Sequence, residues 1–582
     1  MSRTNTTFFQ RHKAFLTAVL LNLCLLILSI VFCTMQFGTN DDRDISNLLA
    51  NVYGNEWGEY IVFVNVILCR FLSFLYRVTG NVTNWYVLLS VLVSYVSLTA
   101  ITYLLLRRAP KFRLGLILSL ILLTRLYKSH YVIFQFTQNS ALYAAAGVLL
   151  LADGFFHWDR GALVRSLLGV FLLVLGSMVR FQSIYFTLPY LAFFVGYEIL
   201  FTKKDRPFFR WLAGKWKSIA LLCLCPILIL GVRFYHSHVF QSDPTLATFY
   251  EDNLLRAELL DYGFPSYEEN AAALEALGIA ESDMEMFSHQ SFLDKSIFSQ
   301  SVLQAMVDMK GGQATSYSLE NLKLSSIPSV IDYIVTDMTG SPFWWIILAL
   351  CLYFFLCTDR RGFGILLASL FFTLGILWYF LSVNRLPYRV WYAITAPLLI
   401  ALLYLCAKNG PPATARRGFS RGVRKCMGYA LYAICLALIL LTGRQFLLDR
   451  SVVVSDTYEQ IVAFAEEHPD DLVLLDRPTV SPLTYASTVS PLTALPSGSH
   501  QNICYQGGWI CWTPANLATL ERFDTKNVYE SIANGMEVYL IDGETCYEKL
   551  RFIRRHYNNS VRLALISYIG DTKIGIYRFY VP

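Results

Sequence analysis

A cluster of carboxylates follows the first apolar run of the chain. The run "AFLTAVLLNLCLLILSIVFCTMQF" ends at Phe37, and "GTNDDRDISN" (38–47) comes directly after it. Carboxylates this close together repel one another, so the pKa of at least one should rise towards a range useful for proton transfer. Such a group could act as a general base towards an incoming hydroxyl. The alternative interpretation is that these acids, near an outer helix end, are simply solvated. Asp44 is predicted as the N-cap of a helix that starts at Ile45.

Basic residues stand at the ends of several other apolar runs. Arginine suits a phosphate because its guanidinium donates hydrogen bonds in pairs. A single such residue is explained by a side chain that reaches the lipid headgroups, whereas a set at one membrane surface favours a phosphate-bearing ligand. The set comprises Arg180 in "MVRFQS", Arg385 and Arg389 in "VNRLPYRVW", Arg125, Lys128 and His130 in "RLYKSH", and Arg233, His236 and His238 in "VRFYHSH".

Composition places the chain in a membrane. Of 582 residues, 55% are hydrophobic and 15% are charged, and the mean hydropathy is +0.45. Soluble domains carry about 25% charged residues, so the deficit indicates lipid. The net charge of +6 gives no case for nucleic acid, because positive residues in membrane proteins sort by side. The predicted spans are 14–36, 84–106, 114–134, 140–156, 164–180, 183–201, 218–235, 343–357, 362–381, 391–407 and 427–446.

The distribution of Lys and Arg predicts the topology. Positive clusters before the first span and in "RRAPKFR" should both be cytoplasmic, so two spans separate them. The stretch 60–77 then does not cross and is predicted as a helix in the outer interface. The loops 202–217 and 407–425 carry six positive residues each and come out cytoplasmic, while 234–342, with four positive and sixteen acidic residues, comes out outside. We predict a multi-pass cell-membrane protein with a cytoplasmic N-terminus and an extracytoplasmic C-terminal domain.

Two larger segments lie outside by this topology. Residues 1–446 form the transmembrane module, with an outer loop 37–83 that contains the interfacial helix and a helical outer loop 234–342. In that loop, "NLLRAELLDY" and "SFLDKSIFSQSVLQAMVDM" are predicted as helices, and "KGGQ" ends the second. Residues 447–582 are predicted as an α/β domain, with helices at "DTYEQIVAFAEEH" and "YEKLRFIRRHY", strands at "DLVLLD" and "MEVYLID", and a closing hairpin in "VRLALISYIGDTKIGIYRFYV".

Three further features have residue types that could carry chemistry. "HSH" with Asp243 could hold a divalent metal, although histidines at i and i+2 do not share a helix face, so no metal is assigned. "CYQGGWIC" could close a small disulfide between Cys504 and Cys511 if it faces an oxidising space. The aromatic residues of "YQGGWICWTP" could stack on a sugar, but a turn in the protein core is favoured.

The predicted topology puts the carboxylates and the basic groups at the same outer surface. This combination indicates transfer chemistry on a lipid phosphate, in which arginines stabilise the departing phosphate as its charge develops. The sequence contains no Walker loop, HExxH or G-x-S-x-G motif. Because no ATP is available outside, the donor would have to be pre-activated and lipid-linked.

These features resemble the GT-C superfamily of integral-membrane glycosyltransferases. The resemblance rests on "NDDRD" just after span one, the interfacial helix at 60–77, the many spans, the late outer loop "NRLPYRVW" and the outer C-terminal domain. The "NDD" opening is most similar to bacterial members that decorate surface polysaccharides, including the O-antigen glucosyltransferase type. No WWDYG-like motif occurs, which separates the chain from oligosaccharyltransferases.

The resemblance implies a polyprenyl-phosphate sugar as donor and specific roles for the residues. Asp41 would be the base, Asp42 the second catalytic acid, and Arg43 a basic group close behind them. Arg385 and Arg389 would bind the donor phosphate, and we add Arg180, Lys128 and Arg43 to this set. His130, Arg233 and His236 are candidates for substrate contacts.

Three functions fit the sequence to different degrees. The favoured one is transfer of a sugar from a polyprenyl phosphate to a glycan acceptor, either a cell-surface glycan or a wall polymer. A polymerase or ligase of lipid-linked polysaccharide is the second, less favoured because such proteins rarely end in a folded outer α/β domain. A non-catalytic transporter or scaffold in surface-polymer assembly ranks last, because transporters place charges near the bilayer midplane and repeat their halves.

Overall fold

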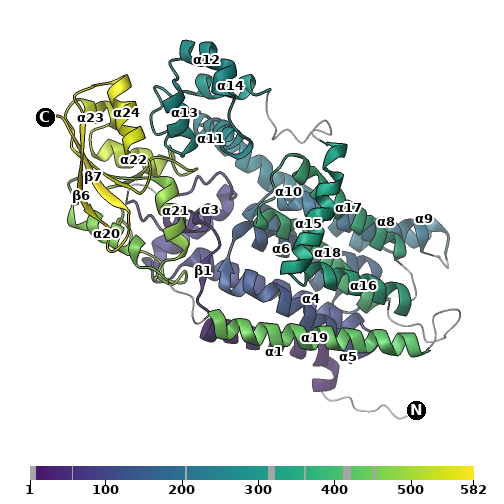
Figure 1. Ribbon diagram of the computed structural model, residues 1–582. Helices are drawn as coiled ribbons and strands as arrows, with labels where there is room; N and C mark the ends of the chain where they lie inside the picture. Colours follow the sequence, from purple (N-terminus) through teal and green to yellow (C-terminus); the bar gives the residue numbers. More distant parts are fainter. Residues whose placement is uncertain are drawn as a thin grey trace. The chain divides into compact units, whose positions relative to one another are not determined.

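The computed structural model describes residues 8–54, 57–202, 206–311, 322–358, 362–409, 421–449 and 454–582. The chain divides into two compact units. We call the first the helical unit; it contains Met1–Met35, Leu89–Arg233 and Leu322–Val452. We call the second the mixed unit; it contains Gln36–Leu88, Phe234–Asn321 and Val453–Pro582 (Figure 1). The segments predicted outside, 37–83, 234–342 and 447–582, thus contribute most of their residues to a single unit.

Apolar helices make up the helical unit. Within the described ranges, nine helices are long and apolar enough to cross a membrane, and a bent pair would make ten. The protein is therefore a multi-pass α-helical membrane protein, as predicted. Its helices are α1 (Phe8–Phe32), α4 (Trp85–Arg108), α5 (Phe112–Tyr127), α6 (Phe136–Phe156), α7 (Ala162–Val179), α8 (Ser183–Phe201), α9 (Phe208–Ala213), α10 (Trp216–Ser242), η3 (Leu324–Ser326), α15 (Ile327–Gly340), α16 (Phe343–Cys357), α17 (Phe363–Ser382), α18 (Tyr388–Lys408) and α19 (Arg421–Asp449).

Some predicted spans differ in detail from the helices. The predicted span 114–134 is α5, which continues into the π-helical turn η1 (Lys128–Val132) and then into β2 (Ile133–Phe134). The predicted span 343–357 is α16, which α15 precedes at a bend of 102°. Within the basic loops 202–217 and 407–425 that were used for the topology, residues 203–205 and 410–420 lie outside the described residues.

Small residues bring α6 and α7 into close contact. A Cβ on Gly147 would lie 2.6 Å from the Gly169 carbonyl oxygen, and a Cβ on Gly176 would lie 3.0 Å from that of Ser140. Ser140 Oγ donates to the Gly176 carbonyl oxygen at 2.7 Å. Membrane helices lack a hydrophobic force between them, so close backbone approach and interhelical hydrogen bonds stabilise their contacts.

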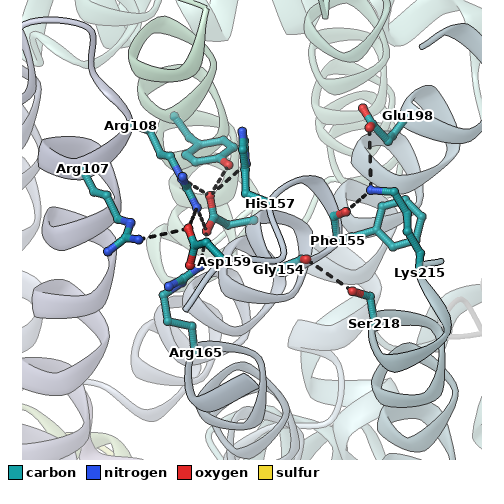
Figure 2. Close-up of polar contacts among 12 residues, drawn as sticks. Arg107, Arg108, Gly154, Phe155, His157, Asp159, Arg165, Glu198, Lys215 and Ser218 are labelled. Atoms are coloured by element: carbon teal, nitrogen blue, oxygen red, sulfur yellow. Dashed lines mark hydrogen bonds and ion pairs between the residues drawn. The ribbon is translucent and has the colours of Figure 1, made fainter. Parts of the chain in front are cut away.

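Charged residues of the helical unit gather where α4, α6 and α18 end and α7 begins (Figure 2). Arg108 donates through Nε and Nη2 to the two carboxylate oxygens of buried Asp153, at 2.6 and 2.7 Å. Tyr404 OH donates to the same carboxylate at 2.8 Å. Asp159 accepts from Arg107 at 3.0 Å and from Arg165 at 2.8 Å. The topology assigns these four helix ends to one side of the membrane, and they do meet.

A second group of polar contacts, also drawn in Figure 2, lies at the end of α6. Lys215 donates to the Phe155 carbonyl oxygen and lies 3.8 Å from the Glu198 carboxylate. Ser218 Oγ donates to the Gly154 carbonyl oxygen at 3.3 Å. These contacts satisfy carbonyls at the end of α6 that have no partner within the helix.

The helices of the mixed unit come from segments that precede or follow membrane spans in the sequence. They are α2 (Asn40–Leu49), α3 (Val66–Thr79), α11 (Pro244–Tyr262), α12 (Tyr267–Ala276), α13 (Glu281–Ser288), α14 (Gln300–Met309), α20 (Thr457–Glu467), α21 (Arg477–Tyr485), α22 (Pro514–Arg522), α23 (Val528–Ala533) and α24 (Cys546–His556). A two-residue strand, β1 (Gln36–Phe37), stands before α2.

Capping residues set several of these boundaries. The helix predicted at 60–77 is α3, which starts at Val66 because Asn65 accepts from the Ile67 amide at 3.0 Å. It ends at Gly80, whose φ of 65° closes the last turn. The helix predicted in "SFLDKSIFSQSVLQAMVDM" is wrong over its first half. Only α14 forms there, because Ser299 caps the helix and accepts from the Val302 amide.

The C-terminal segment carries a mixed sheet in the strand order β4-β3-β5-β7-β6. Strand β3 (Val473–Leu475) pairs in parallel with β4 (Ile503–Tyr505) and with β5 (Val538–Asp542). Antiparallel β7 (Gly575–Tyr580) joins β5 to β6 (Arg562–Tyr568), which confirms the closing hairpin. Every residue of β3, β4 and β5 is buried, as expected for strands covered on both faces.

A buried ion triad fixes the carboxyl ends of β3 and β5. Lys549 of α24 is fully buried and donates to Asp476 at 2.8 Å, to Asp542 at 2.5 Å and to Thr545 at 2.6 Å. Asp476 also caps α21 by accepting from the Thr479 amide, and Asp542 accepts from the Thr545 amide in the turn before α24. Burial opposes charge on Lys549, but the two carboxylates outweigh it and raise the pKa of Lys549.

We expect Lys549→Met to destabilise the mixed unit strongly. It leaves two buried carboxylates without their cation, which costs about 3–5 kcal/mol in comparable sites. The measurement is thermal unfolding of the detergent-solubilised protein, where this change should lower the unfolding temperature by roughly 5 °C or more. Arg551→Met on the same helix is the control, because the Arg551 side chain is 59% exposed. Equal unfolding temperatures for the two variants would contradict the role of the triad.

Candidate functional site

The acidic motif forms the first turn of α2, immediately after the first membrane helix. The helix starts at Asn40, and Thr39 precedes it in an extended conformation. The predicted N-cap role of Asp44 is therefore wrong, because Asp44 lies inside the helix, five positions after Thr39. Asp41 and Asp42 stand in the first turn, where the positive end of the helix dipole favours carboxylates.

The three carboxylates of the motif have different surroundings. Asp42 is fully buried and accepts from Tyr86 OH at 2.7 Å and from Thr39 Oγ1 at 3.0 Å. Asp44 is 1% exposed and forms an ion pair with Arg477. Asp41 is partly exposed. Of the three, Asp41 is thus the carboxylate that an incoming molecule can reach.

Arg43 and Arg477 tie the motif to the C-terminal segment. Arg43 is 4% exposed, donates to the Thr484 carbonyl oxygen at 2.9 Å and lies 4.3 Å from the centre of the Tyr458 ring. Arg477, the first residue of α21, donates to Asp44 Oδ2. The Asn40 amide, with its oxygen turned towards Arg477, accepts from Nε at 3.3 Å. The Arg43 guanidinium, predicted to bind phosphate, is thus engaged inside the mixed unit.

Sequence patterns did not single out Arg477 or Tyr86. Arg477 follows the strand-ending Asp476 in "LLDRP", and only the strand itself was predicted there. Burial raises the pKa of the Asp44 carboxyl, and the Arg477 charge opposes that shift. Asp44 Oδ1 and Arg477 Nη1 are buried and have no hydrogen-bond partner within the described part of the chain.

The other candidate motifs of the sequence lie in the mixed unit, and their contacts there test the predictions made for them. Trp512 is 1% exposed and donates to the Leu293 carbonyl oxygen at 2.9 Å, so "YQGGWICWTP" is a core turn, as predicted. Cys504 and Cys511 are buried and free, so the disulfide is not formed. Asp243 caps α11, His236 Nδ1 accepts from the Val66 amide at 3.4 Å, and His238 is exposed. Within the described ranges, no group of three or more His, Cys, Asp and Glu could hold a metal.

Three of the predicted basic residues, Arg43, His236 and His238, belong to the mixed unit. The others belong to the helical unit. Arg180 ends α7 and lies 5.2 Å from the Phe136 ring centre, and Arg233 lies 5.0 Å from that of Phe181. Arg389 lies in the first turn of α18, and Arg385 stands just before that helix. Each of these four arginines is partly exposed.

A π-helical turn carries Lys128 and His130. The turn η1 follows α5 directly, and π-helical turns often mark functional sites. His130 is fully buried, with Nδ1 at 2.8 Å from Asn139 Oδ1 and Nε2 at 2.6 Å from Tyr392 OH. Lys128 is partly exposed. His130 therefore holds α6 and α18 together at this turn.

A small pocket opens beside this turn, entirely within the helical unit. It is lined by Arg125, Leu126, Phe343, Tyr388, Trp391, Tyr392, Thr395 and Ala396. Arg125 Nε and Trp391 Nε1 are both buried and have no hydrogen-bond partner among the described residues. Two buried donors without acceptors are unfavourable, and both residues line this pocket. Arg125 belongs to the predicted motif "RLYKSH", whereas Trp391 gave no signal in the sequence.

Comparisons with known proteins give a distant structural likeness. No protein-family model matches the sequence, and no curated protein sequence matches it. Among solved structures, the crystal structure of ArnT from Cupriavidus metallidurans in the apo state is similar to this chain, with a TM-score of 0.41 and 12% sequence identity over 97% of both chains. At this identity and TM-score, the likeness does not by itself assign an activity.

The surroundings of His500 in the mixed unit should make stability depend on pH. His500 is 1% exposed, and its neighbours are Arg43, Tyr53, Tyr458 and Ser499. Burial, with help from the Arg43 charge, lowers the pKa of His500 to about 3. Below pH 6.5, the unfolded chain takes up a proton that the folded chain does not. The free energy of unfolding therefore falls by about 1.4 kcal/mol per pH unit as the pH drops from roughly 6 towards 4.

We expect His500→Gln to reduce this acid sensitivity. Glutamine does not titrate, so the unfolding temperature should fall less between about pH 7 and pH 5 than in the parent protein. His289→Gln is the matched control, because His289 is exposed in the same unit. If His500→Gln and the parent lose stability in parallel over this range, the assignment of the buried neutral histidine is incorrect.

Proposed function

We propose that this chain is a GT-C-type membrane glycosyltransferase that moves a sugar from a polyprenyl phosphate to a cell-surface glycan or wall polymer on the outer membrane face. The observation that carries the proposal is the difference in exposure among the three carboxylates of the motif. Asp42 and Asp44 are buried and bonded within the mixed unit, while Asp41 is partly exposed at the first turn of α2. One accessible carboxylate beside two fixed ones suits a general base.

The membership of the mixed unit supports an outer-face reaction. Its three segments come from the parts of the chain that charge distribution predicts outside. The acidic motif and the C-terminal sheet belong to this unit, so a soluble acceptor glycan would meet Asp41 on that side. A donor that is soluble in the membrane would then approach from the lipid.

The chemistry needs a proton acceptor and a site for the leaving phosphate. Asp41 would take the proton from the acceptor hydroxyl, whose oxygen bonds to the anomeric carbon of the sugar. The bond from that carbon to the phosphate oxygen breaks, and polyprenyl phosphate leaves with the electron pair. Arg125, Arg180, Lys128, Arg385 and Arg389 of the helical unit are the candidates that stabilise its charge.

We expect Asp41→Asn to lower sugar transfer by about 10²-fold or more, because general bases contribute roughly that factor. The measurement is mass spectrometry of surface glycans in a strain that lacks the chromosomal copy and expresses each variant. Asp308→Asn, at an exposed acid of the same unit, is the control. Wild-type levels of glycan modification in the Asp41→Asn strain would remove Asp41 from the mechanism. A change in polymer length in place of its sugar content would favour the polymerase alternative.

We expect Arg125→Met to weaken binding of undecaprenyl phosphate by about tenfold, the effect of losing one charge-assisted hydrogen bond. Because Arg125 Nε lacks a partner within the described part of the chain, the variant should keep the unfolding temperature of the lipid-free protein. Native mass spectrometry measures the first quantity and thermal unfolding the second. Arg113→Met is the control, since Arg113 is exposed near the opposite end of α5. Unchanged lipid affinity would exclude Arg125 from the phosphate site.

A further inference from the structure

One side chain of the C-terminal segment contacts both ends of the acidic turn. Arg477 donates to Asp44 Oδ2, and its Nε reaches the Asn40 amide oxygen. Asn40 and Asp44 are four positions apart, so they lie above one another on a single face of α2. Asp41 and Asp42 stand between them in the sequence. Arg477 therefore spans the turn that presents Asp41.

We propose that Arg477 is a positioning residue for Asp41, and that the C-terminal segment is for this reason part of the catalytic apparatus. This proposal rests on the transfer function proposed above. Arg477 does not touch substrate in this role. It fixes the rotation of α2 about its own axis, and thereby the direction in which the Asp41 carboxylate points.

Burial makes this contact selective for arginine. Arg477 and Asp44 are each 1% exposed, so water cannot replace either partner. The planar guanidinium presents donors in a fixed fork, which can serve Asn40 and Asp44 together, whereas a lysine ammonium cannot keep both directions. A lysine would preserve the charge and lose the angular constraint.

A second contact holds the same helix to the C-terminal segment. Arg43 donates to the Thr484 carbonyl oxygen at 2.9 Å, and Thr484 belongs to α21, the helix that Arg477 begins. Arg43 also lies 4.0 Å from Glu459. The helix α2 is thus held to α21 at two points, and loss of Arg477 should alter its orientation more than its attachment.

The test compares turnover with lipid binding in the full-length protein. The variants are Arg477→Met, Arg477→Lys, Asp44→Asn and the double variant Asp44→Asn/Arg477→Met. The transfer rate per folded protein is measured in membrane vesicles from the expressing strain, which hold the native donor, with glycan from the deletion strain as acceptor. The affinity for undecaprenyl phosphate and the unfolding temperature are measured on the purified proteins.

We expect Arg477→Met and Asp44→Asn each to lower the transfer rate by about 10–100-fold, the scale of a misplaced catalytic group. The affinity for undecaprenyl phosphate should stay within about twofold of the parent, because the proposed phosphate ligands are other residues. The double variant should be no slower than the worse single variant, since both changes break one contact. Arg477→Lys should recover part of the unfolding temperature and little of the rate.

Two results would overturn the proposal. One is a folded Arg477→Met or Asp44→Asn protein that transfers sugar within about twofold of the parent. The other is a loss of rate that Arg477→Lys restores in step with the unfolding temperature, which would make the contact structural only. Should Arg477→Met fail to fold, the near-isosteric Asp44→Asn decides by the same criteria.

Asp41→Asn in the same vesicles separates this proposal from the proposed function. If Asp41→Asn is inactive while the Arg477 variants keep their rate, only the positioning role fails. If Asp41→Asn transfers sugar as fast as the parent, the proposed function fails, and Arg477 has no base to position.

Discussion

The buried ion pair between Asp44 and Arg477 is the constraint on which the acidic motif depends. Its partners are 433 positions apart in the sequence and are each 1% exposed. A buried charge without a partner is strongly unfavourable, so each of the two residues stabilises the burial of the other. The C-terminal segment must therefore fold against α2, and the turn that carries Asp41 and Asp42 takes its orientation from that contact.

The two units place their ion pairs differently because their surroundings differ. The helical unit keeps its ion pairs at helix ends, where Arg108 and Asp153 meet, and leaves the apolar middles of the helices for lipid and for one another. The mixed unit holds some of its ion pairs in its interior, as with Lys549 between Asp476 and Asp542. Such pairs specify which segments meet, since only the correct partner satisfies the charge.

Environment assigns different tasks to three neighbouring carboxylates. Asp42 accepts from Tyr86 and Thr39 and is shielded from solvent, Asp44 is neutralised by an arginine, and Asp41 stays partly exposed. The proposed catalytic role of Asp41 follows from this contrast, because the residue types alone are the same. In the helical unit, Arg125 Nε and Trp391 Nε1 are buried without a hydrogen-bond partner among the described residues.

The sequence by itself determined the elements whose signal is local. Apolar length predicted the membrane helices, the run of apolar residues in "DLVLLD" predicted β3, and alternation predicted the closing hairpin. The acidic turn after α1 was likewise evident as a candidate site. Only the tertiary structure decided what each charge in that turn does. Local patterns suggested a cap at Asp44, the family resemblance suggested a phosphate ligand at Arg43, and neither gave a signal at Arg477. The partners of these residues lie hundreds of positions away, and a pairing between distant residues leaves no trace in the local pattern of a single sequence.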